Sequence, residues 1–254
     1  MGQGDAALIE CDGRYMLIDG GDTSAADTVY NLLVDRDIKH LDFLVMTHLH
    51  ADHIGGLPKA LTYATNIDKT ICNSDYADTE IFRKVSKELG TNGATITIPH
   101  EGDKYNLGSA EVEVIYAKAD EPNDSLVLMV TYGDTQFLFT GDIEETAQKA
   151  ITEKYVNPDD KEFKIDLIKM PHHGSDKSED NNIDDITSSM YRFLRTFMPE
   201  YAVISVGAGN KYGHPGERTL SLLRDLDARV YRTDENGDIT VKSNGNTISV
   251  TTSR

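Results

Sequence analysis

An apolar run that ends in a dense group of histidines limits the folds open to this chain more than any other feature. Residues 41–47 read LDFLVMT, and residues 48–53 follow with three imidazoles and one carboxylate in the order HLHADH. A continuous apolar run of this kind predicts a strand buried on both faces, which is typical of a parallel sheet covered by helices. Polar side chains directly after such a strand collect at one sheet edge, where the sites of α/β proteins lie.

The spacing of the residues in this turn divides them into two pairs. His48 and His50 are two positions apart, so at the end of a strand they point to the same face and can reach one metal ion. Asp52 and His53 follow on the turn, where a curved backbone can direct them to a second ion. Imidazole and carboxylate together suit Zn, and also Fe or Mn, better than Ca or Mg. Surface histidines in a polar loop are a poor alternative, because three of the chain's 8 histidines fall in this turn.

Two further apolar segments end in residues of the same kind. FLFTGD, residues 137–142, ends in Asp142, which is suited to bridge two metal ions. Asp142 could also be the N-cap of the helix that follows, and the two roles can coexist. IKMPHHGS, residues 168–175, contains His172 and His173, of which one can bind a metal while the other contacts a substrate. We therefore expect three strand ends to contribute to one metal site.

Strand-like and helix-like segments alternate along the whole chain. The predicted strands are 6–11, 14–21, 41–47, 68–74, 94–99, 105–108, 110–117, 125–133, 135–142, 166–170, 201–206, 229–233, 238–243 and 246–252. The predicted helices are 24–37, 58–64, 78–89 (ended by Gly90), 144–155, 187–197 and 217–227, and the polar stretch 175–185 is predicted to be a surface loop. Because no linker-like stretch interrupts this order, we predict one α/β domain over residues 1–254, with sheets inside and helices outside.

Charge and composition argue against several classes of protein. The net charge is −18, from 43 acidic and 25 basic residues, and such a surface repels the phosphate backbone that a dedicated nucleic-acid binder must attract. No apolar run approaches 18 residues, so we expect no membrane segment. The start MGQGDAALIE lacks the features of a signal peptide, which leaves cytoplasmic and extracellular locations open. Nothing in the sequence indicates an oligomeric state.

The motifs, in their order, resemble those of the metallo-β-lactamase fold hydrolases over nearly the whole chain. THLHADHIGG, FLFTGD and PHHGS carry the resemblance. The segments GQGDAALIE, NDSLVLMV, VISVGAGNKYGHP and RVYRTDENGDI further resemble the hydrolase domain of the bacterial competence DNA-uptake protein ComEC. The resemblance implies a four-layer αβ/βα sandwich with a dinuclear metal centre. Relatives have a strand before the segment that begins here at Gly2, which suggests that this sequence lacks the first strand of the fold.

The resemblance also implies a role for each candidate residue. His48 and His50 would hold the first ion, Asp142 would bridge, and the second ion would be held by Asp52, His53 and His173. The candidates for catalysis are Asp52, His172 as a substrate contact, and His214, in YGHP, as a proton donor or phosphate ligand. Asp5 and Asp19 would lie near the site, where Asp19 would orient a ligand histidine, although both fit equally well as turn residues that accept backbone N–H groups.

One departure from the family pattern concerns the first ion. Many relatives place a third histidine between the HLHADH turn and the bridging aspartate, but the only histidine in that interval here is His100, which we predict to be a surface residue. The corresponding region contains Asn123 and Ser125. The first ion would then bind two histidines, Asp142 and water, which leaves the open position that a catalytic metal needs. Lys211 and Tyr212, beside His214, are candidate substrate contacts, with a solvated loop as the alternative.

The sequence therefore predicts a hydrolase that uses two divalent metal ions, Zn first and Mn or Fe as alternatives. A metal-bound hydroxide would attack a phosphodiester. The resemblance points to DNA, single-stranded DNA included, whereas the negative charge favours a small or surface-exposed phosphodiester. A β-lactam is disfavoured because the third histidine is missing. The alternative is a metal-binding scaffold or sensor that keeps the ligands without turnover.

Overall fold

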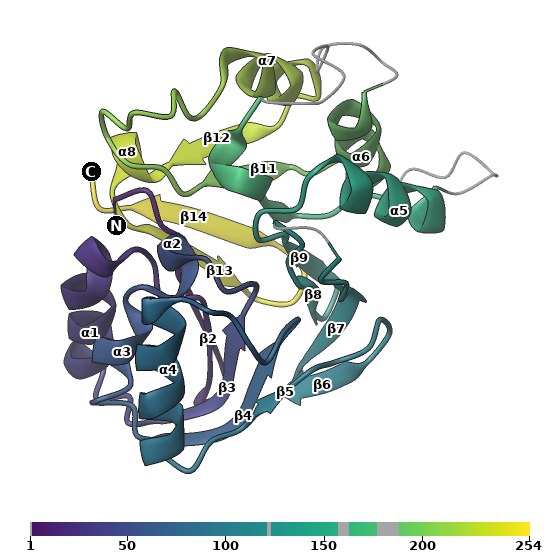
Figure 1. Ribbon diagram of the computed structural model, residues 1–254. Helices are drawn as coiled ribbons and strands as arrows, with labels where there is room; N and C mark the ends of the chain where they lie inside the picture. Colours follow the sequence, from purple (N-terminus) through teal and green to yellow (C-terminus); the bar gives the residue numbers. More distant parts are fainter. Residues whose placement is uncertain (1, 121–122, 157–162, 177–187) are drawn as a thin grey trace. The chain divides into compact units, whose positions relative to one another are not determined.

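The computed structural model describes residues 2–120, 123–156, 163–176 and 188–254, and the chain divides into two compact units, Met1–Leu126 and Val127–Arg254 (Figure 1). Most of the polar stretch 175–185, predicted to be a surface loop, lies outside the described residues. Among the helices of the described ranges, none combines the length and the apolar character that a membrane crossing requires.

The first unit is built on a five-stranded sheet in the order β1-β2-β3-β4-β5. Its strands are β1 (Ala7–Cys11), β2 (Arg14–Ile18), β3 (His40–Met46), β4 (Asn66–Cys72) and β5 (Ile96–Thr97). β1 and β2 form the expected antiparallel hairpin, and β2 to β5 run parallel. Met46 pairs with Cys72, so β3 and β4 end at the same edge of the sheet. Residues 41–46 of β3 are all buried, as the continuous apolar run predicts.

Helices of the first unit lie together against this sheet, as α1, α3 and α4 show in Figure 1. The helices are η1 (Thr23–Ala25), α1 (Ala26–Asp35), α2 (Ala51–Ile54), α3 (Leu57–Ala60) and α4 (Glu80–Thr91), and the hairpin of β6 (Lys104–Leu107) and β7 (Ala110–Tyr116) completes the unit. Leu33 of α1, Leu57 of α3 and Val85 of α4 join the β3 side chain of Leu44 in one core. The predicted helix end at Gly90 is wrong, because α4 continues through this glycine to Thr91.

The second unit contains a sheet in which β12, β11, β10, β9 and β8 are successive neighbours. These strands are β8 (Val127–Tyr132), β9 (Thr135–Phe139), β10 (Leu167–Lys169), β11 (Tyr201–Ile204) and β12 (Arg229–Arg232). β8 and β9 form an antiparallel hairpin, while β9 to β12 run parallel. The carboxyl ends of β9, β10 and β11 therefore meet at one edge.

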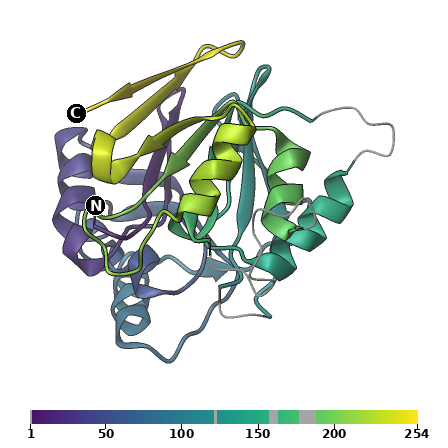
Figure 2. The same cartoon turned by 90° about the horizontal axis from the view of Figure 1, so that it is seen from above.

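Helices follow most strands of the second unit. They are η2 (Pro171–Gly174), α5 (Glu145–Tyr155), α6 (Ser189–Phe197), α7 (Glu217–Asp225) and α8 (Thr233–Asn236), and the chain ends with the hairpin of β13 (Ile239–Ser243) and β14 (Ile248–Thr252). α5 and α6 lie side by side (Figure 2), and the rings of Tyr155, Phe163 and Phe197 pack together there. Each predicted helix and strand has a counterpart in the described residues, with ends shifted by a few positions.

Candidate metal centre

Histidine and carboxylate side chains of the kind that bind metal ions gather beyond the carboxyl ends of parallel strands in each unit. In the first unit they follow β3, and in the second they follow β9 and β10.

Three histidine rings come together after β3. The chain leaves the strand at Met46 and bends, so that the ring centroids of His48 and His50 lie 4.6 Å apart. His53 lies on α2, and its ring centroid is 4.1 Å from that of His48. His48 and His53 are buried, whereas His50 is exposed at the start of α2. β3 thus ends before His48, and Asp52 and His53 lie on α2, so the prediction that His48 and His50 end the strand and that Asp52 and His53 lie on a turn is wrong in these details.

The buried carboxylate of Asp19 holds His53 in one orientation. Its Oδ2 lies 2.7 Å from Nδ1 of His53 and accepts the hydroxyl of Thr47 at 2.7 Å, and its Oδ1 accepts the Thr47 backbone N–H at 2.8 Å. Burial raises the pKa of Asp19, and the interactions with His53 and Thr47 oppose that rise. In the tautomer in which Nδ1 of His53 donates to this carboxylate, Nε2 carries the lone pair. Histidines that bind metals are commonly held in this way.

Ser125 and Thr47 position His48 in a similar manner. The Ser125 hydroxyl lies 3.2 Å from Nδ1 of His48 and donates to the backbone carbonyl of Asn123 at 3.1 Å, so it can accept the Nδ1 proton. The Thr47 hydroxyl is 3.3 Å from the same nitrogen. The segment predicted to stand in place of a third histidine therefore contacts the Nδ1 side of His48. His100 is 91% exposed, as predicted.

The amino-terminal segment packs closely against the histidine turn. The backbone N–H of Asp5 donates to the carbonyl of Asp52 at 3.1 Å, and the carbonyl of Asp5 accepts from Gly21 at 2.7 Å. A Cβ atom at Gly4 would collide with the backbone of Asp52 and Asp22, so the close approach requires glycine there. Asp5 is buried, and Asp52 is half-buried.

In the second unit, Asp142 and His173 are both buried and lie close together. Nε2 of His173 is 3.7 Å from Oδ2 of Asp142. This separation is too long for a hydrogen bond but suits two donors that share one ion, since each would stand about 2.0–2.2 Å from a zinc ion. Nδ1 of His173 donates to the Ser205 carbonyl at 3.0 Å, which again leaves Nε2 as the donor to a metal. The N-cap of α5 is Glu144, so the alternative role of Asp142 as that N-cap is wrong.

The backbone around the paired histidines is unusual. His172 and His173 have φ of 46° and 55°, and Gly174 follows with 73°. Each non-glycine residue in this left-handed region costs on the order of 1–2 kcal/mol. The turn is tied down by hydrogen bonds from His172 N–H to the carbonyl of Gly141 (3.2 Å) and from Gly216 N–H to that of Gly174 (2.9 Å). Hydrogen bonds to other parts of the second unit thus stabilise a strained turn, and this turn fixes the positions of the imidazoles of His172 and His173.

The side chains of Glu144 and His214 lie beside His172. Nδ1 of this residue lies 3.0 Å from Oε1 of Glu144, and 28% of its side chain is exposed. The ring of His214 lies 5.7 Å from the ring of His172 and 6.3 Å from that of His173. Asn210 fixes the backbone of His214, because its side chain accepts the N–H at 3.1 Å and donates to the carbonyl at 2.6 Å.

Sequence reasoning missed Thr47, Glu144 and Asn210. Thr47 is the residue between the apolar strand and His48, Glu144 lies two positions after Asp142, and Asn210 belongs to the same loop as His214. All three lie within a few sequence positions of a predicted site residue, and this closeness in sequence is the signal by which they could have been found. Lys211 and Tyr212 are exposed on that loop, and the Tyr212 ring stacks on the ring of His214.

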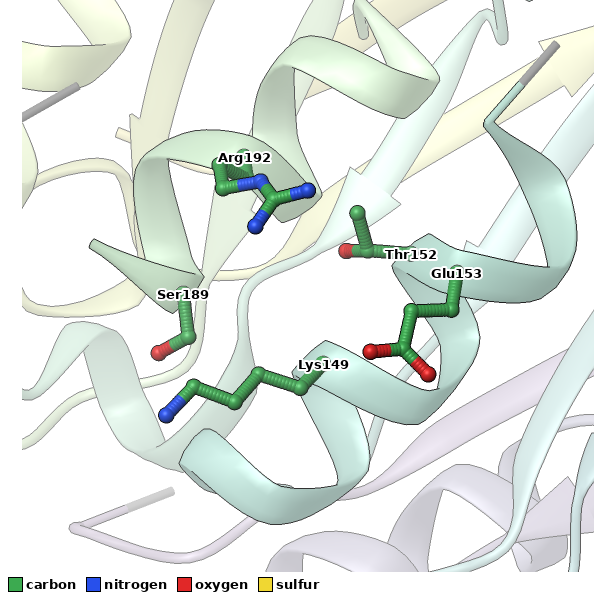
Figure 3. A pocket seen from close by; sticks show the side chains of 5 residues that line it. All are labelled: Lys149, Thr152, Glu153, Ser189 and Arg192. Atoms are coloured by element: carbon green, nitrogen blue, oxygen red, sulfur yellow. The ribbon is translucent and has the colours of Figure 1, made fainter. Parts of the chain in front are cut away.

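A hollow between α5 and α6 is separate from these groups (Figure 3). It is lined by Lys149, Thr152, Glu153, Ser189 and Arg192. None of these was predicted as a site residue, and Glu153 is the only one of them with a side chain of a common metal-binding type.

A smaller acidic group in the first unit is better explained by ion pairs. Nε2 of His40 lies 2.9 Å from Asp68, which is half exposed. Asp42 accepts from the guanidinium of Arg14 at 2.7 Å and from the backbone N–H of Tyr15 at 2.8 Å. Because the carboxylate of Asp42 is already engaged by these two donors, we assign no metal to this group.

Comparison with known proteins gives a family and two curated relatives. The model of the Metallo-beta-lactamase superfamily matches residues 1–207. The chain is 27% identical over 261 residues to ComE operon protein 3 of Bacillus subtilis, covering 94% of this chain and 32% of that protein. It is 27% identical over 242 residues to competence protein ComA of Neisseria gonorrhoeae, covering 93% and 30%. The chain therefore spans about a third of the length of these relatives.

Solved structures with a similar fold have far less similar sequences. The metallo-beta-lactamase fold protein YhfI from Bacillus subtilis is 12% identical, with a TM-score of 0.56 over 91% of this chain and 89% of that one. A diphosphatase of the PhnP family is 15% identical, with a TM-score of 0.50 over 89% and 80%. The expected metallo-β-lactamase fold and the resemblance to ComEC-like competence proteins are thereby confirmed.

Proposed function

Because this chain belongs to the metallo-beta-lactamase superfamily, whose members are generally hydrolases, we propose that it is a dinuclear metal-dependent phosphodiesterase. One observation carries the proposal. The three buried histidines, His48, His53 and His173, each have Nδ1 within hydrogen-bonding distance of a protein oxygen atom, which is the way in which metal-binding histidines are commonly oriented.

The donor set fits two divalent ions. In this proposal His48 and His50 would hold the first ion, and Asp52, His53 and His173 would hold the second. Asp142 would be a ligand shared by both ions. A mixture of imidazole and carboxylate donors supports Zn, with Mn or Fe as alternatives.

The metal ions would supply, when bound, a water of lowered pKa and positive charge opposite the attacked group. The chain's own residues would do the rest. The carboxylate of Glu144 on Nδ1 of His172 orients that imidazole, so that its Nε2 can contact a phosphate oxygen or the leaving oxygen. His214, whose ring lies beside that of His172, is the second candidate for giving a proton to the leaving oxygen.

The competence proteins among the relatives favour DNA as the substrate. The charge of −18 opposes binding of a long polyanion and favours a short single strand or a small phosphodiester. The single-stranded form has a further advantage for a site of buried side chains, because its backbone can bend into the site without a paired strand.

The test is metal content together with hydrolysis of a substrate panel. The purified chain is analysed for metals and assayed with bis-(p-nitrophenyl) phosphate, single-stranded DNA, double-stranded DNA and a thioester. We expect bound metal, hydrolysis of a phosphodiester, and loss of both in Asp142→Ala, whereas His100→Ala serves as the matched surface control. Bound metal without hydrolysis of any substrate would instead support the scaffold or sensor alternative, and full activity of Asp142→Ala would exclude the mechanism.

A further inference from the structure

We infer that Tyr212 is a base-stacking residue, whose exposed ring binds a nucleobase of a single-stranded polynucleotide while the neighbouring phosphodiester lies at the histidines of the second unit. This inference rests on the proposed function, because it names the substrate class of the same site. All the residues that carry it belong to the second unit.

The aromatic rings of Tyr212, His214 and His173 stack one on the next, and the first two belong to the loop that follows β11. Tyr212 is 51% exposed and is one of four large apolar side chains exposed in the described part of the chain. Its ring stacks on that of His214, with centroids 5.8 Å apart and planes at 29°. The ring of His214 in turn stacks on that of His173, with centroids 6.3 Å apart and planes at 24°. A half-exposed aromatic ring is thus connected through the ring of His214 to a buried candidate metal ligand.

The loop that presents Tyr212 is braced from within. The side-chain oxygen of Asn210 accepts the backbone N–H of Tyr212 at 3.1 Å and that of His214 at 3.1 Å. Its side-chain nitrogen donates to the carbonyl of Gly207 at 3.0 Å and to that of His214 at 2.6 Å. A loop already held in one conformation loses little entropy when it binds a ligand, so the ring is prepared for stacking.

The charge of this loop also suits a polyanion. Residues 201–216 contain no aspartate or glutamate, although the chain has 43 acidic residues. The ammonium group of Lys211 lies 5.3 Å from the centroid of the Tyr212 ring, where it can pair with a phosphate next to the stacked base. An aromatic ring beside a positive charge is the usual means of binding single strands without sequence preference.

The absence of tryptophan from the chain provides a direct test. Tyr212→Trp introduces a single indole, whose fluorescence is quenched when a base stacks on it. The matched control is Tyr30→Trp on α1, because Tyr30 also has a lysine ammonium (Lys59) over its ring, at 5.0 Å, and a neighbouring ring (Tyr63). Each variant is titrated with a short oligothymidylate and with the same backbone lacking bases.

We expect the oligothymidylate to quench Tyr212→Trp, the abasic strand to leave it unchanged, and Tyr30→Trp to respond to neither. Equal quenching by the abasic strand, or no quenching by the oligothymidylate, would overturn the inference. This readout needs no turnover, so it stays informative if the proposed hydrolase activity fails.

Kinetics separate substrate binding from a structural role of Tyr212. Tyr212→Ala should raise KM for the oligothymidylate roughly tenfold and leave KM for the abasic strand unchanged, while Tyr212→Phe keeps the wild-type values. An equal loss of kcat on both substrates would show that Tyr212 only supports the loop, and the inference would be wrong.

Discussion

The two units hold their histidines in place by different means. In the first unit side chains do this work, since Asp19, Thr47 and Ser125 contact the Nδ1 atoms of His53 and His48. In the second unit the main chain does it for His173, since the Ser205 carbonyl accepts from this residue and the turn at residues 172–174 has positive φ throughout, whereas the side chain of Glu144 contacts His172.

This difference determines how each half can be perturbed. In the first unit an orienting group can be removed one side chain at a time while the backbone stays unchanged. For His173 in the second unit the orientation depends on the backbone, so a change in the conformational cost of the turn is the way to alter it.

The largest effect is expected where the paired histidines are separated. His173→Ala removes a buried metal donor, so both bound metal and activity should be lost. His172→Ala should retain the metal and lose roughly 10²–10⁴-fold in kcat, the usual contribution of a positioned acid or base. Metal analysis and steady-state kinetics on the two variants decide the assignment. If His172→Ala lost the metal and His173→Ala kept it, the roles of the two residues would have to be exchanged.

The next effect concerns the side-chain support of the first unit. Asp19→Asn keeps the shape of the side chain and removes the charge that holds Nδ1 of His53, so metal affinity should fall roughly 10–100-fold with the fold intact. The measurement is competition with a chelator. Asp42→Asn is the matched control, because Asp42 is a buried aspartate of the same unit with no histidine of the turn as its partner. An equal loss of affinity in both variants would indicate a general effect on the unit.

The main-chain support of the second unit should respond to an added methyl group. Gly174 has φ of 73°, and a Cβ there would lie 2.8 Å from Cβ of Pro215, so Gly174→Ala should lower the free energy of unfolding by roughly 1–3 kcal/mol. Gly209→Ala has a similar φ of 64° with no atom within 4 Å, so it should cost only about 1 kcal/mol. Denaturant unfolding compares them. Equal costs would mean that the contact with Pro215 contributes nothing.

The candidate metal ligands were predicted from the sequence because they come soon after apolar strands. His48, Asp142 and His173 lie two to four positions after the ends of β3, β9 and β10, and His53 lies on the short helix that follows β3. Asp19, directly after β2, was also predicted to orient a ligand histidine, but only from the family resemblance, and the strand ends do not show which histidine each orienting group contacts. Asp19 and His53 are 34 positions apart, and Ser125 and His48 are 77 apart, so only the packed fold brings them together.

Local patterns were also ambiguous where two physical rules compete. Asp142 fits the pattern of an N-cap, but the helix begins only after Glu144, which leaves the carboxylate of Asp142 beside His173. Glycine commonly follows the last residue of a helix, so Gly90 was predicted to end α4. The adjacent Leu89 is buried in the core, and α4 includes Gly90 and ends at Thr91. The assignment of residues 1–254 to one domain stays a prediction.

The smallest effect tests whether a buried aspartate outside the candidate site behaves as an ordinary ion pair. Burial raises the pKa of Asp42, but hydrogen bonds from Arg14 and from the Tyr15 N–H outweigh this, so its pKa lies below the usual 3.8. A carboxyl with a lowered pKa stabilises the fold above its unfolded pKa, and the contribution disappears as pH falls through the folded value. Because Arg14 is 59% exposed, the contribution is about 1 kcal/mol or less.

The difference in unfolding free energy between wild type and Asp42→Asn should therefore be constant near neutral pH and shrink below about pH 4. A difference independent of pH down to acid denaturation would show that Asp42 acts through hydrogen-bond geometry alone, whereas Asp19 would keep its separate effect on metal affinity.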